Sequence, residues 1–217
     1  MRVLVTAGPT YEPLDPVRFL GNRSTGKMGY ALAEAFAETG AEVTLVSGPT
    51  ALPDPASPRI RTVRVETAQQ MYEAAQAVAP QVDVWVFAAA VADYRPATVA
   101  ADKIKKDGDT LTLELVKNVD IAATLGQAKR PEQFSVGFAL ETTNELAHAL
   151  GKLHRKNFDL VVLNSLRDAG AGFGHDTNKV SVLDRAGQVL TFDLQAKTEL
   201  ARQLVQLIQS RFTASYA

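Results

Sequence analysis

The chain has 217 residues, and its 23 Lys and Arg against 24 Asp and Glu give a formal net charge of −1. This balance argues against general affinity for nucleic acid or anionic membranes, because both need clustered positive charge. The absence of Cys excludes disulfides, thiolate nucleophiles and sulfur-ligated metal sites, and three His argue against a multi-histidine metal centre. The sequence holds no apolar run of the ~18 residues that a membrane span needs, and Met1–Arg2 opens into a strand rather than a signal peptide, so we expect a cytoplasmic protein.

Short apolar strands and amphipathic helices alternate along most of the chain. We expect strands at residues 2–6, 42–47, 61–66, 83–88, 134–140 and 159–164. We expect helices at residues 28–39, 67–78, from about 120, at 144–156 and at 197–212, with Thr67 as an N-cap and Gly40 as a C-terminal stop. This alternation predicts a single α/β domain over residues 1–217, with a doubly wound, mostly parallel, Rossmann-like sheet that binds ligands beyond the carboxyl ends of its strands.

Two segments interrupt the alternation. Residues 93–118 form an excursion that contains a basic turn and then an exposed-looking strand at residues 110–116. Connections of this length are usually functional or interfacial, so we expect the excursion to contribute to an active site and to a dimer interface. Near the C-terminus, strands at residues 180–184 and 188–193 flank Arg185–Gly187 and predict a hairpin.

Two nucleotide-binding motifs are incomplete. The loop after the first strand begins with Thr6–Thr10 and lacks the G-x-G-x-x-G pattern of a dinucleotide site. The run Gly21–Lys27 matches the first seven positions of a P-loop, but Met28 stands where Ser or Thr must bind magnesium, and the run follows a polar loop rather than a strand. We therefore predict neither an NAD site nor a P-loop.

The segment Asn22–Lys27 is nevertheless a candidate anion site. It lies at the start of a predicted helix, where backbone N–H groups are unpaired and the helix dipole favours negative charge. Ser24 or Thr25 can cap this helix, and Gly26 allows a phosphate or carboxylate to approach closely; an ordinary N-cap with solvated neighbours explains the segment equally well. Arg18 shares the loop with this segment, so a bidentate contact to an anion is an alternative to simple solvation.

Small residues and a carboxylate follow the strand expected at residues 83–88. Ala88 and Ala89 leave room for a flat ring or a ribose beside the backbone. Asp93 can accept a hydrogen bond from a hydroxyl or hold a magnesium-bound water. Close helix–strand packing with an ordinary turn residue is the alternative explanation.

Several lysines lie on the expected ligand side of the sheet. Lys103–Lys106 form the basic turn of the excursion, and lysine suits the neutralisation of phosphates and of charge that develops in group transfer, although a solvated charge run explains the turn as well. Lys152 and Lys156 share one helical face, which surface solubility also explains. Asn118–Ile121 reads as a helix entry, and Phe138 lies mid-strand, where a core position is the ordinary interpretation.

The order of these motifs resembles a known family. The segments are, in chain order, Thr6–Thr10, Asp15–Arg18, Asn22–Gly29, Ala89–Arg95, Lys103–Lys106, Lys117–Ile121, Val136–Phe138 with Glu141 and Thr142, and Phe173 with Asp176 and Asn178. Over residues 2–212 the chain resembles bacterial phosphopantothenate–cysteine ligase (phosphopantothenoylcysteine synthetase), usually the C-terminal half of a bifunctional coenzyme A biosynthesis protein. In that family the carboxylate of 4′-phosphopantothenate attacks the α-phosphate of CTP, with Mg²⁺ present, and the amine of cysteine then displaces CMP from the acyl-cytidylate.

The resemblance implies a role for each matching residue. Asn22 would hold the acyl-cytidylate, Arg18 would contact its pantothenoyl part, and Lys103 would face the phosphates and assist the chemistry. Lys152 and Lys156 would reach the triphosphate. The cytidine pocket would be shaped by Ala88, Ala89, Asp93, Val119, Asp120, Ile121, Ala122 and Phe138. No residue is assigned as a magnesium ligand.

The resemblance also implies partners. Family members are homodimers whose excursion strand crosses to the other subunit, and residues 110–116 are the natural candidate here. The motifs of the flavin-dependent decarboxylase half have no match in this sequence, so we expect an excised domain or a ligase encoded beside a separate decarboxylase. Pro9 and Thr25 stand where many members have Gly and Ser, and Pro9 removes a backbone amide that could contact an anion.

Two other functions are alternatives to the ligase. A nucleotide-binding regulatory module without catalysis is one, and the presence of Asn22, Lys103 and Arg18 argues against it. An NAD(P)-dependent reductase on a similar fold is the other, and the missing glycine fingerprint disfavours it.

Overall fold

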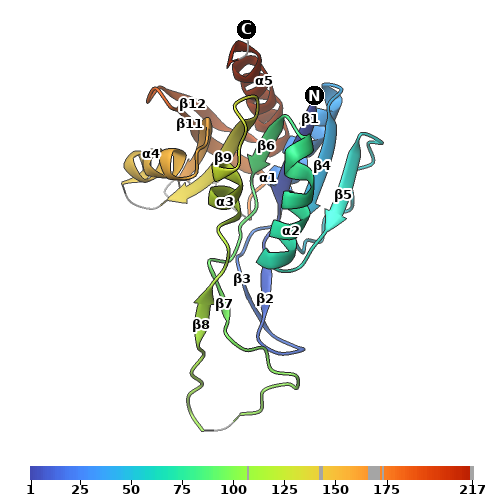
Figure 1. Ribbon diagram of the computed structural model, residues 1–217, viewed down its shortest axis with the longest axis vertical. Helices are drawn as coiled ribbons and strands as arrows, with labels where there is room; N and C mark the ends of the chain where they lie inside the picture. The colour runs from blue at the N-terminus through green and yellow to red at the C-terminus, as the bar shows by residue number, and fades with distance from the viewer. Residues whose placement is uncertain (107, 142–143, 166–171, 173, 216–217) are drawn as a thin grey trace.

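A mostly parallel sheet forms the centre of the protein. The computed structural model describes residues 1–106, 108–141, 144–165, 172 and 174–215. The sheet has the strand order β12-β11-β10-β9-β6-β1-β4-β5, in which the strands from β5 across to β10 are parallel and the β11–β12 hairpin is antiparallel (Figure 1). Its strands are β1 (Arg2–Ala7), β4 (Glu42–Ser47), β5 (Ile60–Arg64), β6 (Val84–Phe87), β9 (Phe134–Glu141), β10 (Leu160–Ser165), β11 (Thr177–Asp184) and β12 (Val189–Ala196). The predicted doubly wound α/β fold is confirmed.

Helices cover both faces of the sheet. One apolar cluster joins the sheet to α1 (Lys27–Glu38) and α5 (Lys197–Ser215), and the other joins it to α2 (Ala68–Val78), α3 (Ile121–Gln127) and α4 (Glu145–Arg155) (Figure 1). Successive side chains of β1 enter opposite clusters because strand side chains alternate between faces. With both faces buried, β1 needs apolar residues at nearly every position, which explains its continuous apolar sequence.

Three local sequence signals have the expected structural role. Thr67 caps α2 in a capping box, where its side chain accepts from the Gln70 N–H and the Gln70 side chain accepts from the Thr67 N–H. Gly40 follows α1 with a φ of +88°, a conformation that an L side chain rarely adopts. Gly187, with a φ of +77°, closes the turn between β11 and β12.

Two expectations about local structure are wrong. The strand expected at residues 110–116 is reduced to β8 (Leu115–Lys117), which pairs with β7 (Tyr94–Pro96). The Glu114 carbonyl still accepts from the Ala97 N–H at 2.9 Å, but residues 110–113, which also alternate in polarity, are not assigned to a strand in the described part of the chain. Alternation alone does not form a strand without a neighbour to pair with. Neither Ser24 nor Thr25 caps α1, because the N-cap is Gly26 at φ +80° and no side-chain hydrogen bond caps the helix.

Two short antiparallel pairs project beyond the carboxyl edge of the sheet. The loop after β1 contains a hairpin, β2 (Tyr11–Pro13) and β3 (Phe19–Gly21), that the sequence pattern did not predict. β7 and β8 lie beside it, and the connection between them extends farthest from the body of the protein (Figure 1). We call these two pairs and their connections, residues 11–21 and 94–117, the arm.

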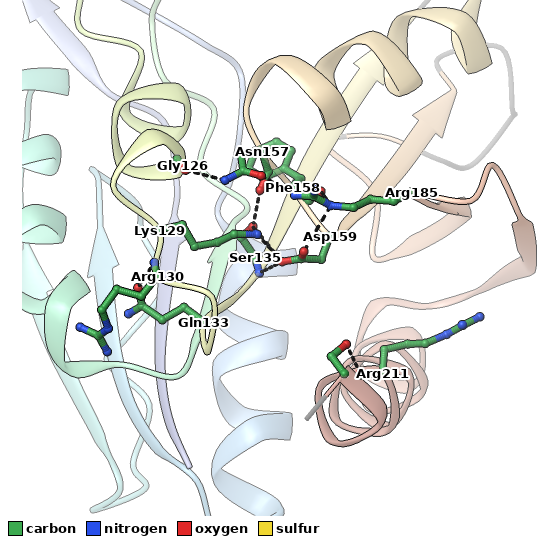
Figure 2. Close-up of polar contacts among 11 residues, drawn as sticks. Gly126, Lys129, Arg130, Gln133, Ser135, Asn157, Phe158, Asp159, Arg185 and Arg211 are labelled. Atoms are coloured by element: carbon green, nitrogen blue, oxygen red, sulfur yellow. Dashed lines mark hydrogen bonds and ion pairs between the residues drawn. The ribbon is translucent and has the colours of Figure 1, made fainter. Parts of the chain in front are cut away.

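A network of polar side chains lies at the opposite edge of the sheet, where the parallel strands begin. Lys129 follows α3 and donates through Nζ to Asp159 Oδ2 at 2.6 Å and to Ser135 Oγ at 3.0 Å (Figure 2). Arg185, after β11, donates through Nε to the carbonyl of Phe158 at 2.8 Å. The network therefore ties α3, β9, β10 and the hairpin together. Over the described residues, none of the helices has the length and apolar character needed to cross a bilayer.

Candidate active site

Two adjoining cavities lie at the carboxyl edge of the sheet, where the chain order reverses between β1 and β6. Open α/β sheets bind their ligands at such a switch point. The cavities have volumes of about 260 and 170 Å³. Residues that line both are Ala89, Val91, Asp93, Phe138 and Lys152, so a ligand in one cavity would lie next to a ligand in the other.

The first turn of α1 forms one wall of the larger cavity. Gly29 lies against the end of β1, so close that a Cβ added there would be 2.5 Å from Cβ of Ala7. Residues 24–29 line the cavity, and an α-helix leaves its first N–H groups without helical partners. This wall therefore offers backbone donors and the positive end of the helix dipole to an anion.

The predicted nucleotide-binding residues, apart from Lys103, gather around the two cavities. The larger cavity is lined by Ala88, Ala89, Asp93, Phe138 and Lys152. The smaller cavity is lined by Ala89, Asp93, Val119, Asp120, Ile121, Ala122, Phe138, Lys152 and Lys156. Asp120 is the N-cap of α3, where its Oδ1 accepts from the Ala123 N–H at 3.1 Å.

The two lysines selected from the sequence, Lys152 in α4 and Lys156 at its C-cap, each face a carboxylate. Lys152 Nζ lies 2.7 Å from Glu141 Oε1, and Lys156 Nζ lies 2.9 Å from Asp120 Oδ1. The shared helical face expected from their spacing directs both ammonium groups toward the smaller cavity, which both residues line. Each lysine can exchange its carboxylate partner for a phosphate oxygen.

The three residues proposed to assist catalysis lie outside the two cavities, unlike the predicted nucleotide-binding residues: none of the three lines either cavity in the described part of the chain. Asn22 lies at the rim, where its Nδ2 donates to the carbonyls of Ala90 and Val91 at 3.0 and 3.2 Å. Arg18 binds the carboxylate of Asp15 and the carbonyl of Ile104. Lys103 is exposed on the arm.

Sequence reasoning missed two polar residues of the larger cavity. Lys197, the first residue of α5, is only 6% exposed, and its Nζ donates to the carbonyls of Gly172 and His175 at 2.9 and 2.6 Å. Burial lowers the pKa of the Lys197 ammonium, and the nearby charge of Lys27 lowers it further. Asn164, at the end of β10, accepts from Asn178 Nδ2 at 3.0 Å. The only sequence signal for Asn164 was a polar residue at the carboxyl end of a buried strand.

A further ion pair borders the larger cavity. Lys27 Nζ lies 2.6 Å from Asp176 Oδ1, and this contact lowers the pKa of the Asp176 carboxyl group. Thr142 and Phe173, which belong to the motifs quoted above, lie outside the described residues. Among the described residues there is no group of three or more His, Asp or Glu side chains that could hold a metal ion.

The comparisons with known proteins identify a family for this chain. Residues 1–212 match the family model described as DNA/pantothenate metabolism flavoprotein C-terminal domain. The chain is 45% identical over 212 residues to the coenzyme A biosynthesis bifunctional protein CoaBC of Vibrio cholerae, a match that covers 97% of this chain and 52% of that protein. It is 47% identical over 207 residues to a cysteine/cysteine sulfinic acid decarboxylase of an unknown prokaryotic organism, covering 95% of this chain and 57% of that protein.

A solved structure is similar along its whole length. The crystal structure of the C-terminal domain of the coenzyme A biosynthesis bifunctional protein CoaBC has a TM-score of 0.83 and 44% sequence identity, with 98% of this chain and 96% of that chain covered. The chain spans about half the length of the curated relatives that it matches. From the family match over residues 1–212, the chain belongs to the family of DNA/pantothenate metabolism flavoprotein C-terminal domains.

Proposed function

We propose that this chain is a phosphopantothenate–cysteine ligase of coenzyme A biosynthesis, which uses CTP to join 4′-phosphopantothenate to cysteine. The observation that carries the proposal is the pair of adjoining cavities at the switch point, which share Ala89, Asp93, Phe138 and Lys152. The smaller cavity would take the triphosphate of the nucleotide and the larger cavity the acidic substrate, so that the reacting carboxylate and phosphate would meet beside the shared residues. The similarity to the CoaBC C-terminal domain supports the choice of reaction.

The chemistry needs no covalent enzyme intermediate. A carboxylate oxygen attacks the α-phosphorus of CTP, a P–O bond forms, and the bond to pyrophosphate breaks. The amine of cysteine then attacks the acyl carbon, loses a proton and expels CMP, which leaves an amide. In both steps negative charge develops on oxygen, so fixed donors and cations are the groups that lower the barrier.

The lining residues can supply these groups. Lys152 and Lys156 would bind the triphosphate in place of their present carboxylate partners. The first turn of α1, with Lys27 and the buried Lys197, would attract the anionic acid substrate to the larger cavity. Asn22, whose amide lies at the rim beside Ala90, would orient the acyl-cytidylate. Ala88, Val119, Ile121 and Ala122 would form the apolar walls around the cytosine.

Magnesium is part of the proposal. Mg²⁺ usually keeps several waters and binds one or two carboxylates together with phosphate oxygens. Asp93 and Asp120, which line the smaller cavity, fit that requirement and would hold the ion beside the triphosphate. When bound, the ion would reduce the negative charge of the phosphates that the carboxylate must approach.

We also propose that the chain acts as a homodimer through the arm. Large apolar side chains are exposed there: Val17, Phe19, Tyr94, Val99, Leu111, Leu113 and Leu115. A group of large exposed apolar residues on one projecting segment is typical of a protein interface. Because Lys103 lies on the arm and not at the cavities described here, the arm of a second copy would bring it to the phosphates. We place this reaction in the cytoplasm, with the decarboxylase activity either in another part of the same polypeptide or in a separate protein.

The test is an assay of pyrophosphate release. Pyrophosphate should appear only when phosphopantothenate, CTP and Mg²⁺ are present together, and CMP and the amide product should appear only after cysteine is added. The rate of pyrophosphate release with ATP in place of CTP measures the preference of the site for cytosine over adenine. Tight CTP binding without turnover would instead support a regulatory module, and a change of NADH fluorescence on titration would support a reductase.

A further inference from the structure

The hairpin β2–β3 contains a buried carboxylate that the reaction described above does not use. Asp15 is 3% exposed and lies in the turn between the two strands. Its Oδ1 accepts from the N–H groups of Val17 and Arg18 at 2.8 and 2.9 Å. A buried carboxylate is costly unless donors surround it, so the stability of the hairpin depends on these hydrogen bonds to Asp15.

The same carboxylate reaches a residue far away in the sequence. Asp15 Oδ2 accepts from the N–H of Ile104 at 3.0 Å, and from Nε and Nη2 of Arg18. Arg18 Nη2 also donates to the carbonyl of Ile104 at 2.9 Å. Both backbone polar groups of Ile104 are thus bound by one Asp–Arg pair, which fixes that residue in position and orientation.

A backbone contact next to this pair supports the same attachment. The N–H of Ala100 donates to the carbonyl of Leu14 at 3.0 Å. The connection that leads from β7 into the basic turn is therefore attached to the hairpin at two points four residues apart in sequence. Lys103 and Lys105 flank Ile104 directly, so the attachment determines where their backbone lies.

The Asp15 carboxylate is ionised at neutral pH, which strengthens its hydrogen bonds to Ile104 and Arg18. The hydrogen bonds from the Arg18 side chain, together with those from the N–H groups of Ile104, Val17 and Arg18, hold the pKa of the Asp15 carboxyl group well below its ordinary value. The carboxylate stays ionised throughout the neutral range, and charge-assisted hydrogen bonds are stronger than neutral ones. Nε and Nη2 of Arg18 are already engaged by Asp15 and Ile104.

We propose that Asp15 and Arg18 are positioning residues, which act by binding Ile104 and so present the Lys103 ammonium at a fixed place, rather than residues that contact the substrate. The inference rests on the proposed function for the role of Lys103. It changes the role that family resemblance implies for Arg18, from contact with the pantothenoyl group to attachment of the arm.

Hydrogen exchange of the Ile104 amide tests the attachment without any assay of activity. In Asp15→Asn, an NH₂ group replaces one of the carboxylate oxygens and cannot accept the hydrogen bonds that this oxygen accepted. The Ile104 amide should therefore exchange at least about tenfold faster than in the unaltered protein. Asp54→Asn is the matched control, because Asp54 likewise binds Nε and Nη2 of an arginine, Arg64, which also donates to a loop carbonyl. An unchanged Ile104 rate in Asp15→Asn would overturn the proposal. If Asp15→Asn does not fold, Arg18→Lys serves in its place. It removes the contact to the Ile104 carbonyl and keeps the charge, so the Ile104 amide should exchange faster even though Asp15 is still present to accept from it, and an unchanged rate would overturn the proposal.

A kinetic cycle with Lys103→Gln tests the consequence. Asp15→Asn should lower kcat/KM for pyrophosphate release about tenfold or more in the unaltered background, and less than about twofold when Lys103 is already Gln. Asp15→Glu should restore part of the loss. Equal losses in both backgrounds would show that Asp15 and Arg18 act independently of Lys103, and would overturn the proposal. If no variant and no unaltered protein releases pyrophosphate, the proposed function fails, whereas the exchange rates still decide the attachment.

Discussion

At the scale of single residues, the lysines of the candidate site differ in how strongly they are held. Lys152 and Lys156 each face a carboxylate, and Lys197 is buried against two carbonyls. Lys103 is exposed on the arm, beside the attached Ile104. Lys152 and Lys156 must each release a carboxylate before they bind a phosphate, and we therefore propose Lys103, which is exposed, as the group that stabilises the charge developing during the reaction.

Replacing Lys103 with Gln should therefore lower kcat/KM for pyrophosphate release severely, because Gln is a neutral group that cannot stabilise developing phosphate charge. A loss below about threefold, which is under ~0.7 kcal/mol of transition-state stabilisation, would contradict the role. Lys105→Gln, on the other side of Ile104, is the matched control and should cost less than that.

Lys129 illustrates a residue that matters for stability and not for chemistry. Its side chain is 6% exposed, and it forms an ion pair with Asp159 on the edge of the sheet opposite the cavities (Figure 2). Lys129→Met should destabilise the protein by about 1–3 kcal/mol in urea unfolding, because the partly buried Asp159 loses its partner at 2.6 Å and keeps the more distant Arg185, at 3.4 Å, as its remaining cation. Glu42→Gln, which breaks the exposed pair with Arg59, should leave the urea midpoint unchanged. Equal effects of the two variants would contradict the importance of burial.

At the scale of elements, the contact between α1 and β1 determines the shape of the larger cavity. A Cβ at Gly29 would lie 2.5 Å from Cβ and 3.1 Å from Cα of Ala7, and neither atom can move without its strand. Gly48 is similarly restricted, since its added Cβ would lie 1.7 Å from the carbonyl oxygen of Pro9. These two glycines let the first turn of α1 and the loop after β4 approach the end of β1.

Gly29→Ala should accordingly destabilise the protein by about 1–3 kcal/mol, even though Ala raises helix propensity by about 1 kcal/mol, because overpacking outweighs that gain. Gly151→Ala provides the opposite case in α4, where an added Cβ would meet nothing within 4 Å. That variant should stabilise the protein by up to about 1 kcal/mol. Thermal unfolding of both variants measures the difference, and a stabilised Gly29→Ala would contradict the close contact.

At the scale of the whole molecule, most of the large exposed apolar residues in the described part of the chain lie in two places. One group lies on the arm and includes Leu111, Leu113 and Leu115; the other lies on the edge strand β12 and includes Leu190 and Leu194. The arm extends away from the body and has no covering element within the described chain, so a second copy is the proposed cover (Figure 1).

Deletion of residues 107–114 should then convert a dimer into a monomer in sedimentation, and an unchanged dimer would refute the proposed interface. The double variant Leu111→Asp/Leu113→Asp should have the same effect, because it places charges in an apolar contact. Leu190→Asp/Leu194→Asp is the control with similarly exposed leucines, and its mass should equal that of the unaltered protein. Dissociation by both pairs would show that the arm is not the specific contact.

The alternation of apolar strands and helices was sufficient to predict the order of the central elements, because burial on two faces requires a continuous apolar strand such as β1. The N-cap at Thr67 and the positive φ at Gly40 follow from local hydrogen bonding and sterics, and both were predicted. Asp93 was selected from the sequence because it follows a buried strand, and the carboxyl ends of parallel strands meet at one edge. Lys156 was assigned to the site through the resemblance to the ligase family, since surface solubility also explained its spacing from Lys152. Their roles in binding stay a prediction.

Other features depended on contacts between distant segments. The sequence by itself determined the fold class and the order of the sheet-forming segments, since periodicity is a local property, and the resemblance to the ligase family added cavity residues such as Ala122 and Lys156. Only the tertiary structure decided that Lys197 is buried beside the larger cavity, that residues 110–113 lack a partner strand within the described chain, and that Arg18 binds Asp15 and Ile104. The physical reason is that a charge or a strand is satisfied by whichever group packs against it, and 89 residues separate Asp15 from the amide that it binds.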